Sequence, residues 1–414
     1  MGKYSLENYY PYETYKIRPE PLLEVPLNIG RGECSFLEYT WEELEPERGS
    51  YEITRIRESL SAIRNTILII NQAPPSWLKE NIPCLINTRE ECFAHLIRRV
   101  GSSLAEEQNI VGVLINTAGE STRVWDAYLE AFDHLPLLAE LEDDKLIRYL
   151  QGKGHSFGLL IKCNENNWIE CCERLAEHQL QNTWERMPVI LLITDMTVGP
   201  NIRREGLRWH AGFANRPMNL GYNFTLRRLT YPKKITGNGA LPVRFWFVNT
   251  GSAPSYKKLQ LKLKLEFRQE LPYDPQHEHS YESQQGNQCE PEQGNSYEPE
   301  HGIPYEAEAV NTDYNFPLHI DHSAWKIGDI THNEILPLPD MKNGIYHLSV
   351  GMFLSDGTPL SLDLKAKEKR GYYELGIIEV NSSLSDDFLH AWDDFYPEGY
   401  YPLEDPQVPN ETND

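Results

Sequence analysis

Two patterns of hydrophobic and polar residues divide the chain. In the first, continuous apolar runs alternate with segments whose apolar residues recur at helical spacing, as in Ile53–Ile63. Continuous apolar runs are typical of parallel strands that are covered on both faces, and their alternation with helices is the signature of βα units. Six strands are predicted in this way: an opening strand that ends in Tyr39-Thr40-Trp41, then Thr66–Asn71, Ile110–Asn116, Phe157–Cys163, Pro188–Asp195 and Leu207–Phe213.

Helices are predicted between these strands. They are Ile53–Arg64, a helix that opens at the capping box Thr88–Glu91, a helix that begins near Arg123, and Trp168–Arg186. A complete (β/α)8 barrel commonly takes about 250 residues, whereas this part of the chain spans about 190. We therefore predict a (β/α)8-like barrel that is reduced or incomplete.

The second pattern begins at Leu220. From there, apolar and polar residues alternate, which is typical of antiparallel strands with one face in water. The predicted strands are Leu220–Leu229, Pro242–Asn249, Leu259–Phe267, Ile345–Phe353 and Tyr372–Val380. This half of the chain is predicted to be a β-sandwich, so the fold class is α/β plus all-β.

Three further segments follow neither pattern. Residues 1–26 are rich in Tyr, Pro and Glu and are predicted to form an arm that packs along the barrel or frays. Residues 272–312 repeat Tyr-Glu among Gln, Gly, Pro and His, and with few aliphatic residues this insertion is predicted to be disordered. Residues 382–414 form an acidic tail. The predicted barrel domain then covers 27–218, and the sandwich domain covers 219–381.

The formal net charge of −23 comes mostly from the insertion and the tail. The stretch from Glu270 to Val310 holds 10 acidic residues, the stretch from Asn381 to Asp414 holds 9, and neither contains Lys or Arg. The remaining chain has a net charge of about −4 and no basic stripe that would neutralise phosphates, so nucleic acid is not an expected partner.

Targeting and cysteine signals are also weak. The N-terminus has no apolar signal segment, and no apolar run approaches the ~18 residues of a membrane span. The seven cysteines show no metal-binding spacing and fit reduced thiols. These features predict a cytoplasmic protein with no membrane partner, no metal and no cofactor, and they leave its oligomeric state open.

Several short motifs carry a family resemblance. Trp41-x-x-Leu-Glu-Pro-x-x-Gly-x-Tyr51 resembles the first strand and loop of clan-A glycoside hydrolases. Further motifs are Pro75-Ser-Trp-Leu78, Gly119-Glu120, Leu220-Gly-Tyr222 and Asn249-x-Gly-x-Ala-Pro-x-Tyr256. Together they resemble a bacterial family of unknown function in which a clan-A-like barrel precedes a β-sandwich. The resemblance implies a carbohydrate ligand and no established substrate.

The resemblance also implies catalytic carboxylates. In clan A, the acid/base Glu follows an Asn at the end of the fourth strand; here Asn116-Thr-Ala-Gly-Glu120 follows a strand end, but three residues separate the Asn from the Glu. Glu120 is thus the candidate acid and Asn116 a candidate substrate-binding residue, the alternative being that Glu120 caps the next helix. Asp195, which ends a strand, is the candidate second carboxylate, and Glu205 in the loop predicted after it is the other carboxylate there. The alternative for Asp195 is ordinary helix capping or loop solvation.

Aromatic residues supply candidate sugar platforms. Trp77 and Trp125 lie near predicted rim loops, and His210 beside a late strand is a candidate pocket residue; core packing is the alternative for all three. Glu33 and Glu38 belong to the opening strand and, five residues apart, cannot share a face.

Two functions follow from these predictions. One is hydrolysis of a carbohydrate by two carboxylates at the C-terminal rim of the barrel. The other is a non-catalytic relative of the same fold that binds carbohydrate or scaffolds a partner, because fold does not fix function. A third hypothesis assigns partner binding to the acidic insertion.

Overall fold

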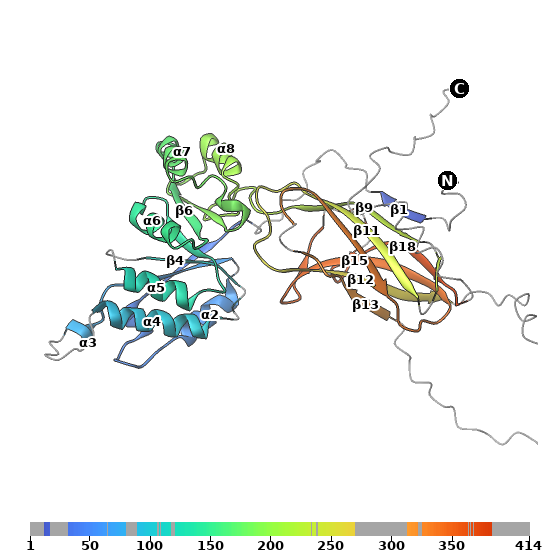
Figure 1. Cartoon of the computed structure of the whole chain (residues 1–414), viewed down its shortest axis with the longest axis horizontal. Helices are drawn as coiled ribbons and strands as arrows, with labels where there is room; N and C mark the ends of the chain where they lie inside the picture. The colour runs from blue at the N-terminus through green and yellow to red at the C-terminus, as the bar shows by residue number, and fades with distance from the viewer. Residues whose placement is uncertain are drawn as a thin grey trace, which may run out of the picture.

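The computed structural model describes residues 12–16, 32–63, 65–79, 89–105, 107, 109–116, 121–232, 234–236, 239–269, 313–321, 325–362, 364, 366 and 368–382. Figure 1 shows two bodies: an α/β domain on the left, formed by the first half of the chain, and a β domain on the right, formed mainly by the second half.

Seven parallel strands form the sheet of the first domain in chain order. They are β2 (Ser35–Thr40), β3 (Thr66–Asn71), β4 (Ile110–Leu114), β5 (Leu137–Glu140), β6 (Gly158–Cys163), β7 (Val189–Ile193) and β8 (Phe213–Ala214). The sheet curls until its ends meet, where the Cys34 amide donates to the Ala214 carbonyl at 2.9 Å and the Ala214 amide donates to the Gly32 carbonyl at 2.7 Å. Because β8 ends at Ala214, this contact reaches only the start of β2, and the barrel is incomplete.

Helices follow most of these strands. They are α1 (Trp41–Leu44), α2 (Thr54–Ala62), α3 (Ser76–Lys79), α4 (Arg89–Ser103), α5 (Thr122–Ala131), α6 (Asp144–Gly152), α7 (Trp168–Glu177), the 3-10 helix η2 (Thr183–Glu185) and α8 (Pro200–Arg208).

Apolar residues fill both sides of the curled sheet. An outer core, which includes Trp41, Phe93 and Tyr128, packs between the strands and the helices. A separate inner core takes residues from every strand or its immediate start: Cys34, Ile67, Val111, Leu114, Leu138, Leu160, Ile190 and Phe213. Burial on both faces is the reason why the strands appear in the sequence as continuous apolar runs.

Two strand predictions in this domain need correction. Strand β5 (Leu137–Glu140) was not predicted, because it has four residues and directly follows Pro136, which hides it from a search for longer apolar runs. The predicted strand Leu207–Phe213 is wrong, since Leu207 belongs to helix α8 and β8 begins only at Phe213. The predicted helix Trp168–Arg186 is also shorter, because α7 ends at Glu177.

The second domain contains two sheets. One has the order β1-β9-β11-β14, with β1 (Tyr12–Lys16), β9 (Phe224–Pro232), β11 (Ala240–Asn249) and β14 (Gly328–Pro337). The other has the order β10-β18-β15-β12-β13, with β16 and β17 attached: β10 (Lys234–Ile235), β12 (Leu259–Gln269), β13 (Asp313–Pro317), β15 (Gly344–Leu354), β16 (Pro359–Leu360), β17 (Glu368–Lys369) and β18 (Tyr372–Val380).

Alternation of side chains explains the second pattern in the sequence. In β15, Tyr346 and Leu348 are fully buried, and they join Leu263 of β12 in one core with Phe245 and Phe247 of β11. Residues of both sheets therefore contribute to a single hydrophobic core. The five strands predicted here are confirmed, although β9 begins at Phe224 rather than at Leu220.

Part of the predicted N-terminal arm is ordered. Residues Tyr12–Lys16 form strand β1, which pairs antiparallel with β9, for example Thr14 with Thr230. This part of the arm therefore joins the second domain instead of packing along the barrel. The predicted insertion at 272–312 and, apart from Ser382, the acidic tail lie outside the described residues.

Candidate functional site

Polar residues occupy the inward positions at the C-terminal ends of six neighbouring strands. Side chains alternate between the two faces of a strand, so a residue two positions beyond an inner-core residue also points inward. When this alternation is followed along each strand from the inner core to the C-terminal end, the last inward-pointing residues are polar. We call these residues the rim ring: Glu38, Asn71, Asn116, Glu140, Lys162 and Thr194. In (β/α)8 enzymes the active site lies at this end of the barrel.

Neighbouring members of the rim ring contact each other in pairs. Asn71 donates through its Nδ2 to Glu38 Oε1 at 3.1 Å, and its Oδ1 accepts the Ala73 amide at 2.9 Å. The Lys162 ammonium contacts Glu140 Oε2 at 2.7 Å, and both side chains are part-exposed. An ionised carboxylate is only an acceptor, so Glu140 in this ion pair is suited to act as a base or nucleophile.

A further carboxyl lies two residues beyond Glu140. Desolvation by the surrounding protein atoms raises the pKa of Glu142, although the residue as a whole is exposed, and the charge of nearby Glu140 adds to this increase. Two carboxyl groups with different environments are therefore close to Lys162.

Asp195, which follows β7, supports the loop after the neighbouring strand β6. Its Oδ2 accepts the Glu165 amide at 3.1 Å, and Thr194 of the rim ring accepts from Asn164 at 3.1 Å. Glu165 in turn accepts the Ile202 amide at 3.0 Å and thereby holds the start of α8.

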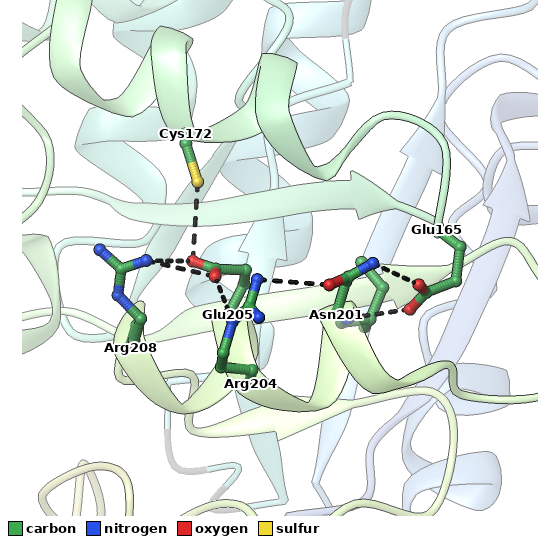
Figure 2. Close-up of polar contacts among 7 residues, drawn as sticks. Glu165, Cys172, Asn201, Arg204, Glu205 and Arg208 are labelled. Atoms are coloured by element: carbon green, nitrogen blue, oxygen red, sulfur yellow. Dashed lines mark hydrogen bonds and ion pairs between the residues drawn. The ribbon is translucent and has the colours of Figure 1, made fainter.

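Figure 2 shows Glu165 and, on helix α8, a second carboxylate, that of Glu205. The sequence placed Glu205 in a loop, but it lies in the helix, with its side chain 1% exposed. It accepts from Arg204 Nε at 2.9 Å and from Arg208 at 3.0 Å, and the Cys172 thiol is 3.7 Å away. Glu205 therefore joins two helices and is not part of the rim ring.

The three aromatic candidates lie in different surroundings. Trp77 of α3 is half-buried and donates through Nε1 to the Glu45 carbonyl at 2.9 Å. Trp125 is 4% exposed and packs in the outer core, with its ring 4.9 Å from that of Tyr149. His210 precedes β8, at the opposite end of the barrel from the rim ring, and its Nδ1 is 2.9 Å from the Ser252 carbonyl of the second domain.

The structure brings one of the predicted site residues into the rim ring. Asn116 follows the inner-core residue Leu114 by two positions and points inward, and Glu120 lies outside the described residues. Asn116 and Glu120 follow β4, which is the third strand of the barrel and not the fourth. The fourth strand is β5, and it ends at Glu140. Sequence reasoning missed Glu140 because it missed β5, and it did not single out Lys162 although the strand of Lys162 was predicted. The available signal was a short apolar run that ends in a charged residue.

Potential metal ligands do not cluster in the described part of the chain, and Cys163 and Cys171 are buried there. No group of three or more His, Cys, Asp and Glu residues there is arranged to hold a metal ion. Burial raises the pKa of Cys163 to about 12, and of Cys171 to about 12, so these thiols stay protonated near neutral pH. Within the same residues, no helix is both long enough and apolar enough to cross a membrane.

Comparisons with known proteins give weak likenesses only. No protein-family model and no curated protein matches the chain. Endo-glycoceramidase II from Rhodococcus sp. in a cellobiose-like imidazole complex is 10% identical, with a TM-score of 0.30 over 59% of this chain and 84% of that one. Its lactosyl-enzyme intermediate is 9% identical, with a TM-score of 0.31 over 74% and 89%. A beta-glucosidase from Listeria innocua with laminaribiose is 10% identical, with a TM-score of 0.20 over 72% and 50%. Scores this low carry no argument about function.

Proposed function

We propose that the protein binds a carbohydrate at the C-terminal rim of its barrel and hydrolyses a glycosidic bond there with two carboxylates. The rim ring carries this proposal, because six strands in succession present a carboxylate, an amide, an ammonium or a hydroxyl at the end where barrel enzymes hold their active sites. These groups exchange hydrogen bonds with sugar hydroxyls, and glycoside hydrolysis requires a pair of carboxyl groups. We also propose that the chain is related to the family that its motifs resemble. We propose as well that its second domain is a β-sandwich.

Roles follow from position and charge. Glu120, four residues after the inward-pointing Asn116, is the proposed proton donor. Glu140, which is paired with Lys162, is the proposed base or nucleophile, and Asp195 is the alternative for that role. Lys162 holds the Glu140 carboxylate in one orientation, and Trp77 is the proposed platform for a sugar ring.

Isosteric variants test these roles. A panel of aryl glycosides is incubated with the wild type, Glu120→Gln, Glu140→Gln and Asp195→Asn, and product release is followed. Loss of a catalytic carboxylate is expected to lower kcat by about 100-fold or more. Glu58→Gln, on the exposed face of α2, is the matched control and is expected to keep the wild-type rate. Equal rates in Glu120→Gln and the wild type would remove Glu120 from the mechanism.

A second function, carbohydrate binding without catalysis, is favoured by the contact that Asp195 makes. Its carboxylate accepts the Glu165 amide and therefore has a structural role in the loop after β6. In that case the wild type hydrolyses none of the aryl glycosides but still binds sugars. Titration of cellobiose and lactose into the wild type and into Glu140→Gln distinguishes the two, because a pure binding site predicts saturable binding without turnover.

A further inference from the structure

A cavity lies at the end of the barrel opposite to the rim ring. Its volume is about 740 Å³, and its wall on the barrel side includes Glu33, Ser35 and Asn65, which stand at the starts of β2 and β3. The wall on the other side comes from the second domain and includes Tyr222 and Thr358. Cavities between domains and of this size are typical of small-molecule sites.

The two walls of this interdomain cavity are held together by direct contacts. The Tyr256 hydroxyl donates to the Trp184 carbonyl at 2.9 Å. Ser252 donates through Oγ to the Ala211 carbonyl at 2.7 Å and accepts the Gly221 amide at 2.9 Å. These bonds join segments on both sides of the cavity, so the site is formed before any ligand binds, which reduces the entropy that binding must overcome.

The lining of the cavity selects a class of ligand. Among the described residues that line it, Glu33 and Lys257 are the charged ones, and one charge of each sign gives no net charge. Phosphate sites use several Arg or Lys donors, and the lining contains a single Lys and no Arg. The hydroxyls of Ser35, Thr358 and Ser361 also line the cavity, and Tyr222 adds an aromatic ring.

This combination suits a neutral polyhydroxylated ligand. A carboxylate accepts hydrogen bonds from two sugar hydroxyls at once, and a hydroxyl group both donates and accepts. Aromatic rings pack against the apolar face of a sugar ring. We propose that the interdomain cavity is a second carbohydrate site, separate from the rim ring, that binds a neutral monosaccharide or disaccharide without cleaving it. The proposal does not require hydrolysis at the rim.

Calorimetric titration of the full chain tests this site with glucose, cellobiose, lactose and maltose, and with inorganic phosphate as a charged probe. Saturable binding of at least one sugar and none of phosphate is expected. Glu33→Gln is expected to weaken that binding by about tenfold or more, a loss of about 1.4 kcal/mol. Thr358→Trp, which fills the cavity from the second domain, is expected to abolish the same binding component that Glu33→Gln weakens and to leave any binding at the rim.

Control variants separate this site from the rim. Glu140→Gln and the surface variant Glu58→Gln are expected to leave the sugar affinity of the cavity unchanged, whatever their effect on hydrolysis. Circular dichroism and thermal unfolding verify that Thr358→Trp is folded. The proposal is overturned if no sugar binds the wild type, if phosphate competes with the sugar, or if the binding is lost in Glu140→Gln and kept in both cavity variants.

Discussion

At the scale of single residues, Glu205 is the most deeply buried carboxylate among the described residues of the barrel domain. Its carboxylate is almost fully buried and accepts from Arg204 and Arg208, whose own side chains are largely exposed. Glu205→Gln keeps the shape but removes the charge that both guanidinium groups contact. We expect the free energy of unfolding to fall by about 1–3 kcal/mol. Urea denaturation measures this loss. Glu177→Gln at the exposed end of α7 is the control and is expected to change the value by less than about 0.5 kcal/mol.

A second prediction at this scale concerns pH. The His178 side chain, which is buried, contacts Asp144 Oδ1 at 2.8 Å, and this hydrogen bond lowers the pKa of Asp144. The pKa in the folded state is thus below the unfolded value of about 3.9, so the contribution to stability is present above that pH and is lost as the pH falls through the folded pKa. Asp144→Asn removes this contribution. Because Asp144 is part-exposed, the difference near neutral pH is expected to be about 1 kcal/mol or less.

Unfolding of the wild type and of Asp144→Asn over a range of pH checks the sign. The difference in stability between them is expected to shrink as the pH falls below about 4. A difference that stays constant or grows toward acid pH would show that Asp144 stabilises the fold by another route.

At the scale of elements, helix α1 follows strand β2 directly and packs into the outer core. Its N-cap, Thr40, forms a capping box with Glu43: the Glu43 amide donates to Thr40 Oγ1 at 3.2 Å and the Thr40 amide donates to Glu43 Oε2 at 2.7 Å. Thr40→Ala removes one half of the box, and we expect the free energy of unfolding to fall by about 1 kcal/mol. Thr54→Ala in α2, whose N-cap is Ile53, is the matched control and should have a smaller effect. Denaturant unfolding of both variants provides the comparison.

Much of the fold is predictable at this scale, and the reason is periodicity. Strands β3, β4, β6 and β7 are long enough for burial on both faces to show as apolar runs, and the switch to alternation after Leu220 marks the second domain. Strand β8 has two residues and β5 has four, so neither carries a measurable period. Sequence patterns could not show that the sheet closes through Cys34 and Ala214, because that pairing joins positions that are 180 residues apart.

The candidate site was less predictable for the same reason. Asn116 was identified because its strand was, and Glu33 and Glu38 were assigned to opposite faces of the opening strand, but Glu140 depended on β5. Inward and outward positions become known only once the register of the whole barrel is known, since a shift of one residue reverses every side chain. The contact between Lys162 and Glu140 follows from that register.

At the scale of the whole molecule, the N-terminal segment and the second domain are coupled through the sheet. Strand β1 lies at the edge of its sheet, and β9 stands between β1 and β11. Deletion of residues 1–16 would leave β9 as an exposed edge, and exposed edges exchange amide protons readily and promote association. The barrel has its own two cores and makes no strand pairing with β1 among the described residues. We therefore expect the deletion to destabilise the second domain and to spare the barrel.

Hydrogen exchange followed by mass spectrometry resolves the two domains. Peptides from β9 and β11 are expected to exchange at least about tenfold faster in the truncated chain, while peptides from β6 and β7 keep their wild-type rates, because local opening reports local stability. The double variant Thr14→Pro, Tyr15→Pro keeps the chain length and removes two consecutive amide donors, one of which must face β9, so it is expected to reproduce the effect. Equal acceleration in β6 and β9 would mean that the two domains unfold as one cooperative unit, and that β1 stabilises the barrel through the second domain.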